Sequence, residues 1–233
     1  MSASCVRRGI LLGFALLLGC VILPQPARAT LPLPYHVLVQ DYEGVNDPRL
    51  CQGIQGHVWI YPNSGWSSVY GSKVNSIYSI NQDGIFVEAG YFYEPPSGVT
   101  TPPMFFSSWQ DRLGQRHEYW SLMSSAHIGS YRAFAVLRTS GDDYNTMYNG
   151  WTMHTYPDTE MVSSWSQAGM ERAYYSTDNG NLSIQYLQSK LYSTGNWSYW
   201  PGPVLGLNDN DGRYKPDTSA LLGSAHWYKV VVQ

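Results

Sequence analysis

Two glutamates lie in stretches of the chain whose other residues are mostly apolar, aromatic or small. Glu88 interrupts residues 84–93, and Glu171 lies within residues 168–175. Neighbours that shield a carboxyl group from water make it harder to ionise and raise its pKa toward the range useful for proton transfer. Two glutamates that face one aromatic-lined cleft would therefore be suited to general acid–base chemistry.

Alternation along a strand predicts the surroundings of each glutamate. Successive side chains of a strand point to opposite faces of the sheet, so Glu88 shares a face with Gly90. We expect this glycine to leave room for the backbone of a ligand. Glu171 shares its face with Gly169 and Ala173, so it too has small neighbours. A glutamate at an arbitrary strand position is more often a solvated side chain on a half-exposed sheet.

The elements that would carry these residues are strands. Alternation of β-branched and aromatic residues predicts strands over residues 36–40, 55–61, 74–79, 85–93, 117–123, 132–139, 151–156, 169–175, 182–192 and 226–232. Turn clusters separate them, and no stretch has a helical period longer than about two turns. These features predict an all-β fold, an antiparallel two-sheet sandwich of the jelly-roll or concanavalin-like type.

The segments around both glutamates resemble the glutamic peptidases, in the eqolisin and neprosin-like branches. Residues 75–80 and 84–91 are similar to the paired strands in which these families carry a catalytic Gln or Glu before a small residue and a glycine. Glu88 falls on that position. Residues 170–182 are similar to the eqolisin segment with the catalytic glutamate, and Glu171 falls on that position. The chain differs from the eqolisins in having Glu rather than Gln at position 88.

The resemblance implies a secreted endopeptidase that hydrolyses polypeptides at acidic pH with no cofactor. Glu171 would act as the general base that activates a water molecule. A protonated Glu88 would donate a hydrogen bond to the developing oxyanion. Tyr91, Trp120 and Trp165 would bind the substrate. We expect no metal ligand, and we expect the protein to be a monomer.

Two other classes of function fit the same residues. Jelly-roll glycosidases also place two glutamates on a concave sheet lined with Tyr and Trp, with carboxyl groups about 5–5.5 Å apart in retaining enzymes and about 6.5–9.5 Å apart in inverting ones. The E-x-D-x-x-E pattern of the commoner families of that fold is absent. A non-catalytic module that binds carbohydrate or peptide would use the nine tryptophans as stacking surfaces.

The N-terminus has the pattern of a secretory signal peptide. Arg7 and Arg8 precede an apolar run over residues 9–23, and a small-residue A-x-A site follows at residues 27–29. We therefore expect residues 1–29 to be removed. The run is shorter than the roughly 20 residues that span a bilayer, so no integral membrane segment is expected.

The remaining part, residues 30–233, is predicted to be a single β-sandwich domain that is secreted. Lipid anchoring at Cys20, in a weak lipobox-like sequence, is the alternative. Residues 30–233 carry all 17 acidic side chains but only 11 of the 14 Lys and Arg, a formal charge of −6. This charge excludes nucleic acid and anionic membrane surfaces as favoured partners.

Two smaller features are interpreted as structural. Cys51 is the only cysteine of residues 30–233, so no internal disulfide is expected there, and we interpret it as a packed side chain rather than a nucleophile. Residues 208–212 with Asp217 have the oxygen ligands of a calcium loop but lack the acid that completes an EF-hand. This pattern favours a plain turn.

Overall fold

The computed structural model describes residues 35–40, 51–62, 73–81, 83–93, 102–161, 165–172, 182–200, 205–207, 214–217 and 228–232. For residues 35–40, 73, 171–172, 205–207, 214–217 and 228–232 only the backbone is described. The chain divides into two units, Met1–Thr30 and Leu31–Gln233, and all described residues belong to the second. Removal of residues 1–29 and a single domain over residues 30–233 stay predictions.

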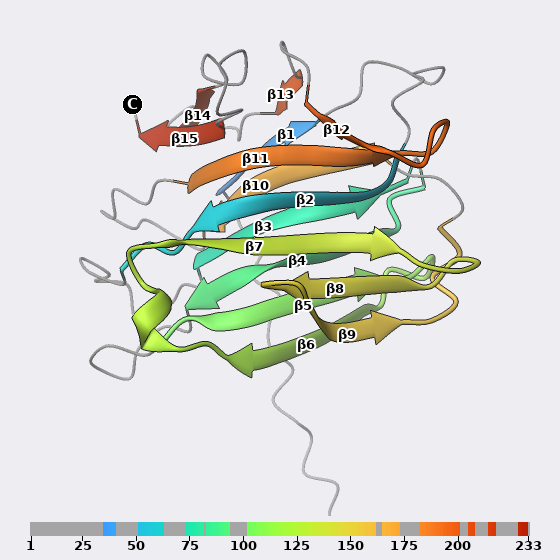
Figure 1. The fold of residues 1–233 in the computed structure, drawn as a ribbon, viewed down its shortest axis with the longest axis horizontal. Coiled ribbons are helices and arrows are strands. Elements are labelled where there is room, and N and C mark those ends of the chain that lie inside the picture. The colour runs from blue at the N-terminus through green and yellow to red at the C-terminus, as the bar shows by residue number, and fades with distance from the viewer. Residues whose placement is uncertain are drawn as a thin grey trace, which may run out of the picture. The chain divides into compact units, whose positions relative to one another are not determined.

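The described residues form strands joined by turns and one short 3-10 helix, η1 (Figure 1). The strands are β1 (Tyr35–Gln40), β2 (Cys51–Trp59), β3 (Lys73–Ile80), β4 (Phe86–Tyr93), β5 (Met104–Gln110), β6 (Arg116–Leu122), β7 (Tyr131–Arg138), β8 (Tyr144–Tyr148), β9 (Trp151–Tyr156), β10 (Trp165–Arg172), β11 (Leu182–Leu191), β12 (Trp197–Tyr199), β13 (Leu205–Leu207), β14 (Tyr214–Asp217) and β15 (Tyr228–Val232), and η1 covers Ser125–His127. No described residue is in an α-helix.

The strands build two antiparallel sheets that lie face to face. Sheet A has the order β13-β1-β10-β3-β4-β5-β6. Sheet B has the order β14-β15-β11-β2-β7-β8-β9, with β12 also paired to β11. Figure 1 shows β11, β2, β7 and β8 of sheet B in front of β10, β3, β4 and β5 of sheet A. The all-β class and the antiparallel two-sheet sandwich predicted from the sequence are confirmed.

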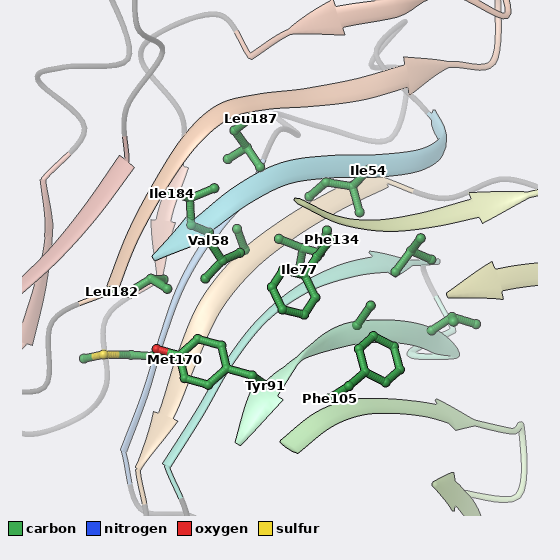
Figure 2. Close-up of a cluster of buried hydrophobic side chains, with 14 of the residues drawn as sticks. Ile54, Val58, Ile77, Tyr91, Phe105, Phe134, Met170, Leu182, Ile184 and Leu187 are labelled. Carbon is green, nitrogen blue, oxygen red and sulfur yellow. The ribbon is translucent and has the colours of Figure 1, made fainter. Parts of the chain in front are cut away.

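The core lies between the sheets, where apolar side chains from both inner faces meet (Figure 2). At its centre Phe105 of sheet A stacks on Phe134 of sheet B, with ring centroids 6.2 Å apart. β4 gives Val87, Ala89 and Tyr91 to this core. A slip of one residue would exchange the two faces of β4, so burial of these residues fixes Glu88 on the outer face of sheet A.

The lone cysteine belongs to the interior as well. Cys51 is fully buried, and its Sγ lies 2.9 Å from the Oγ of Ser166. The Oγ of Ser166 also accepts a hydrogen bond from the Ser189 hydroxyl at 2.7 Å. Cys51 forms no disulfide within the described residues, and its burial agrees with the interpretation of Cys51 as a packed side chain.

Candidate active site

Direct pairing across five strands arranges the outer face of sheet A into rows, because residues opposite each other in an antiparallel pair lie on the same face. The row that contains Glu88 runs through Gln167 on β10, Tyr78 on β3, Glu88 on β4, Ser108 on β5 and Glu118 on β6. We name these five residues the polar row. All but Glu118 at the sheet edge are buried, and Glu88 and Ser108 have no exposed surface.

Aromatic residues flank the polar row on both sides. One neighbouring row is Trp165, Ile80, Phe86, Gln110 and Arg116, and the other is Gly169, Ser76, Gly90, Phe106 and Trp120. Trp165 is half-buried and Trp120 is 44 % exposed. Two of the three aromatic residues predicted to bind substrate therefore share the face of Glu88.

The third predicted substrate contact, Tyr91, belongs to the core, so that prediction is corrected. Tyr91 is fully buried on the opposite face of β4 from Glu88. Its hydroxyl donates a hydrogen bond to the carbonyl oxygen of Trp59 at 3.0 Å. It also accepts hydrogen bonds from the backbone N–H of Tyr61 at 3.2 Å and from the side-chain amide of Asn75. The alternation that points Glu88 outward points Tyr91 inward.

The space expected beside Glu88 is also filled. A Cβ atom at Gly90 would lie 2.1 Å from the carbonyl oxygen of Asn75 and 2.6 Å from the Cα of Ser76. The backbone of β3 thus occupies the volume that a side chain would need. Gly90 is required for the close approach of β3 and β4, and the prediction that it leaves room for a ligand is wrong.

The carboxylate of Glu88 is held by Arg116, which reaches over from the edge strand β6. The Nη2 of Arg116 donates to both carboxylate oxygens at 3.2 Å, and its Nε donates to the Oγ of Ser108 at 3.2 Å. The guanidinium carbon lies 5.6 Å from the ring centroids of both Phe86 and Phe106. The guanidinium is therefore fixed by hydrogen bonds and by two aromatic rings.

This pairing opposes the effect of burial on the carboxyl group of Glu88. Burial alone disfavours an ionised carboxylate, but a guanidinium at hydrogen-bond distance favours it. The environment of Glu88 thus differs from the purely apolar one expected from the sequence, because a cation lies at hydrogen-bond distance from its carboxyl group. The charge of Glu88 also affects the pKa of a tyrosine in the opposite sheet. Burial raises the pKa of Tyr156 on β9 to about 12, and the negative charge of Glu88 acts in the same direction.

Glu171 lies in sheet A but not in the polar row. It is opposite Val74 on β3, and Val74 is opposite Phe92, four residues from Glu88 along β4. Strand spacing and residue rise place the Cα atoms of Glu88 and Glu171 roughly 16 Å apart. The structure therefore brings the two glutamates into one sheet without bringing them opposite each other, and a pairing of their carboxyl groups stays a prediction.

The residue of β10 that lies in the polar row with Glu88 is Gln167, not Glu171. Gln167 was not predicted from the sequence. It is separated from Glu88 by Tyr78 alone, so the two Cα atoms lie about 10 Å apart. Only 7 % of Gln167 is exposed. Residues 167 and 171 have the same parity in β10, so alternation did not distinguish them. The strand register decides between them, and it cannot be predicted from the sequence of one strand alone.

Two further findings concern metals and membranes. In the part of the chain that the structure describes, no three His, Cys, Asp or Glu side chains are grouped to hold a metal ion. Residues 208–212 of the predicted turn lie outside the described residues. Within the described ranges, no helix is long and apolar enough to cross a bilayer.

The two antiparallel sheets define a β-sandwich of the jelly-roll, concanavalin-like type. No protein-family model and no curated protein sequence matches the chain. Among solved structures, the chain is similar to scytalidoglutamic peptidase with a transition-state analogue inhibitor. The TM-score is 0.50 and the identity 9 %, over 85 % of this chain and 97 % of that one.

Two more solved structures are similar at lower TM-scores. The eqolisin peptidase SCP-B, in complex with the tripeptide Ala-Ile-His, has a TM-score of 0.47 and 8 % identity over 85 % of this chain and 97 % of its own. A Bacillus licheniformis β-glucanase has a TM-score of 0.39 and 9 % identity over 84 % of this chain and 78 % of its own. At these identities the likeness concerns the fold, and this chain has a glutamic peptidase-like, concanavalin-type fold.

Proposed function

We propose that this protein is an exported, monomeric hydrolase that cleaves peptide bonds at the polar row, with Glu88 as its catalytic carboxylate. The observation that carries the proposal is the fully buried side chain of Glu88, held by Arg116 in the middle of a row of polar groups. A buried charge is costly unless it is paired. A buried ionisable group with a specific charged partner is a common feature of active sites.

The proposed chemistry is an attack by water on the scissile carbonyl group. Glu88 takes a proton as the water oxygen bonds to the carbonyl carbon, and the carbonyl oxygen gains negative charge. The side-chain amide of Gln167 donates a hydrogen bond to that oxyanion. Glu88 then gives its proton to the leaving nitrogen as the C–N bond breaks. A glutamine is suited to this second role because it stays a neutral donor at every pH.

The resemblance to eqolisins assigns the base to Glu171 instead. The two assignments predict different outcomes for the same variants. If Gln167 completes the site, Gln167→Ala lowers the cleavage rate about 100- to 1000-fold, the usual loss for an oxyanion donor. Glu171→Gln then has a small effect. If Glu171 is the base, the effects are reversed.

The test follows cleavage of a denatured protein substrate by mass spectrometry from pH 2.5 to 7. Glu88→Gln is expected to lower the rate at least about 100-fold, because it removes the proton acceptor. Glu160→Gln is the matched control, since Glu160 is an exposed carboxylate paired with Arg112 at 2.8 Å. Absence of cleavage by the unmodified protein at every pH, or full activity of Glu88→Gln, would contradict the proposal.

A glycoside hydrolase is the second candidate, favoured by the presence of Glu118 in the polar row. Glu88 and Glu118 are separated by Ser108 alone, so their Cα atoms lie about 10 Å apart, compatible with a carboxylate pair of the inverting type. Glu118→Gln separates the two functions: it should abolish polysaccharide hydrolysis but leave peptide cleavage within a few-fold. Binding of glycans or peptides without hydrolysis would favour the binding module.

Export is part of the proposal and has its own test. Residues 1–29 have the signal-peptide pattern, and cleavage after Ala29 would give a mature chain that begins at Thr30. N-terminal sequencing of the protein recovered from the medium should read Thr30 first. A lipid-modified Cys20 at the N-terminus would support anchoring instead, and an intact Met1 would contradict export by this route.

A further inference from the structure

A cavity lies at the end of sheet B where β2 starts and where β7 and β11 finish (Figure 1). Its volume is about 470 Å³, which is within the usual range for sites that bind small molecules. Two of its lining residues are cations and none is acidic, although residues 30–233 carry a net negative charge. None of them belongs to the polar row. The cavity is lined by Gln52, Arg138, Thr139, Gly141, Lys190 and Tyr192.

A β-bulge in β2 lies at this cavity. Lys190 of β11 pairs with Gly53, whereas the next residue, Leu191, pairs with Cys51. Gln52 is therefore the extra residue of β2, without a counterpart on β11. Bulges re-aim a side chain and are over-represented next to active sites. The bulge thus sets Gln52 apart from the regular ladder at the point where its side chain lines the cavity.

Three polar side chains of the lining are available to a ligand. The amide of Gln52, the ammonium of Lys190 and the hydroxyl of Tyr192 make no hydrogen bond and no ion pair in the part of the chain that the structure describes. Gln52 and Lys190 are half-buried, and Tyr192 is 51 % exposed. All three can donate hydrogen bonds. The cavity therefore collects donors that the fold itself does not use.

The turn between β7 and β8 holds two further lining residues in place. Nε of Arg138 donates to the carbonyl oxygen of Gly141, and the hydroxyl of Thr139 donates to the carbonyl oxygen of Asp143 at 3.3 Å. The acidic residues of this turn do not line the cavity. The carboxylate of Asp143 accepts the backbone N–H of Asp158 at 3.1 Å. Arg138 thus adds a second positive charge to the lining.

We propose that this cavity binds a tetrahedral oxyanion of the phosphate or sulfate type, carried by a small molecule. Lys190 and Arg138 supply positive charge, and Gln52 and Tyr192 supply neutral donors from other positions of the lining. Four oxygens can accept hydrogen bonds from several sides at once, whereas a carboxylate presents two oxygens in one plane. Hydrogen bonds between a cation and such an anion are among the stronger ones in proteins. The volume of the cavity leaves room for the rest of the ligand.

The test is a titration of the full chain with inorganic phosphate and with sulfate at neutral pH and constant ionic strength, followed by backbone amide NMR shifts. We expect saturable shifts at residues 52, 139 and 190. Lys190→Met keeps most of the side-chain stem but removes the charge, and it should weaken binding about 10- to 100-fold, the usual loss for a charged donor. Lys190→Arg should bind within a few-fold of the unmodified protein. Because the Lys190 ammonium has no partner in the fold, the Tm of both variants without ligand should be unchanged.

Arg112→Gln is the matched control, because it removes one positive charge outside the cavity, where Arg112 pairs with Glu160. Its affinity for phosphate should equal that of the unmodified protein. Shifts that rise linearly without saturation, or equal affinities for Lys190→Met and the unmodified protein, would overturn the proposal, since phosphate would then act as a general electrolyte. Acetate that binds as tightly as phosphate and sulfate would overturn the assignment to a tetrahedral oxyanion. The readout needs no turnover, so a protein that cleaves no peptide but binds phosphate here would contradict the proposed function alone.

Discussion

Replacement of Gly90 by alanine tests the close approach of β3 and β4 beside the polar row. A Cβ at position 90 would lie 2.1 Å from the carbonyl oxygen of Asn75 and 2.6 Å from the Cα and Cβ of Ser76, whereas ordinary contacts begin at 3.4 Å. Most of these atoms belong to the backbone of β3, so rotation of a side chain cannot relieve the overlap. The strands would have to separate by roughly 1 Å, which weakens their hydrogen bonds.

The expected cost follows from this overlap. Overpacking of a well-packed site costs typically about 1–3 kcal/mol, and we expect the upper end because the neighbours are main-chain atoms. For a protein of this size, about 1 kcal/mol lowers the midpoint of thermal unfolding by about 2–4 °C. Gly90→Ala should therefore lower the Tm by roughly 6–12 °C, measured by circular dichroism at neutral pH.

Gly114→Ala is the control for this substitution. Gly114 has a φ of +75°, but no atom lies within 4 Å of a Cβ built there. Its cost is that of the left-handed backbone alone, about 1 kcal/mol or slightly more, which corresponds to about 2–4 °C. A loss of Tm in Gly90→Ala no larger than in Gly114→Ala would refute the reasoning. Normal stability with reduced activity would instead restore Gly90 as a place where a ligand approaches.

Three further predictions concern the core, the histidines and the exposed edge. Tyr91→Phe should reduce the free energy of unfolding, measured by urea titration, by about 1–3 kcal/mol, because its buried hydrogen-bond partners lose the hydroxyl. The kcat/KM of this variant should stay within two-fold of that of the unmodified protein. A selective loss of activity would instead support contact between Tyr91 and the substrate. Burial lowers the pKa of His127 and His154, so below about pH 6.5 the unfolded chain binds protons that the folded one does not, and the Tm should fall between pH 7.5 and 5.5. His154→Gln should flatten this fall, and an unchanged slope would contradict its role. Trp120→Ala should raise KM with little change in Tm, because the side chain is 44 % exposed beside the polar row, and an unchanged KM would remove Trp120 from the substrate site.

Much of the fold was predictable because β-branched and aromatic residues are frequent in most strands and turn residues separate them. The strand predicted over residues 151–156 coincides with β9, and other predicted strands overlap observed ones with shifted ends. β5 was missed because both of its faces are covered: Phe105 and Phe106 are buried next to each other, and so are Ser107 and Ser108. A strand buried on both faces shows no period of two. β13 and β14 are too short to give a period.

The site was predictable only in part, because it depends on register between strands. Alternation alone put Glu88 on one face of β4 and Tyr91 on the other, so the sequence already held the reason why Tyr91 lies in the core. It did not reveal which residue of β10 comes opposite Tyr78, and that register selects Gln167. Arg116 was overlooked because the predicted strand began one residue after it, whereas β6 begins at Arg116 itself.

The most direct test of the account is the rate of peptide cleavage by Glu88→Gln relative to the unmodified protein, normalised to the folded fraction by near-UV circular dichroism. Folded Glu88→Gln protein should cleave at least about 100-fold more slowly, because the substitution removes the proton acceptor of the polar row. A folded Glu88→Gln protein that cleaves at the unmodified rate would contradict the account, since Glu88 would then be a structural partner of Arg116 and not the carboxylate that does the chemistry.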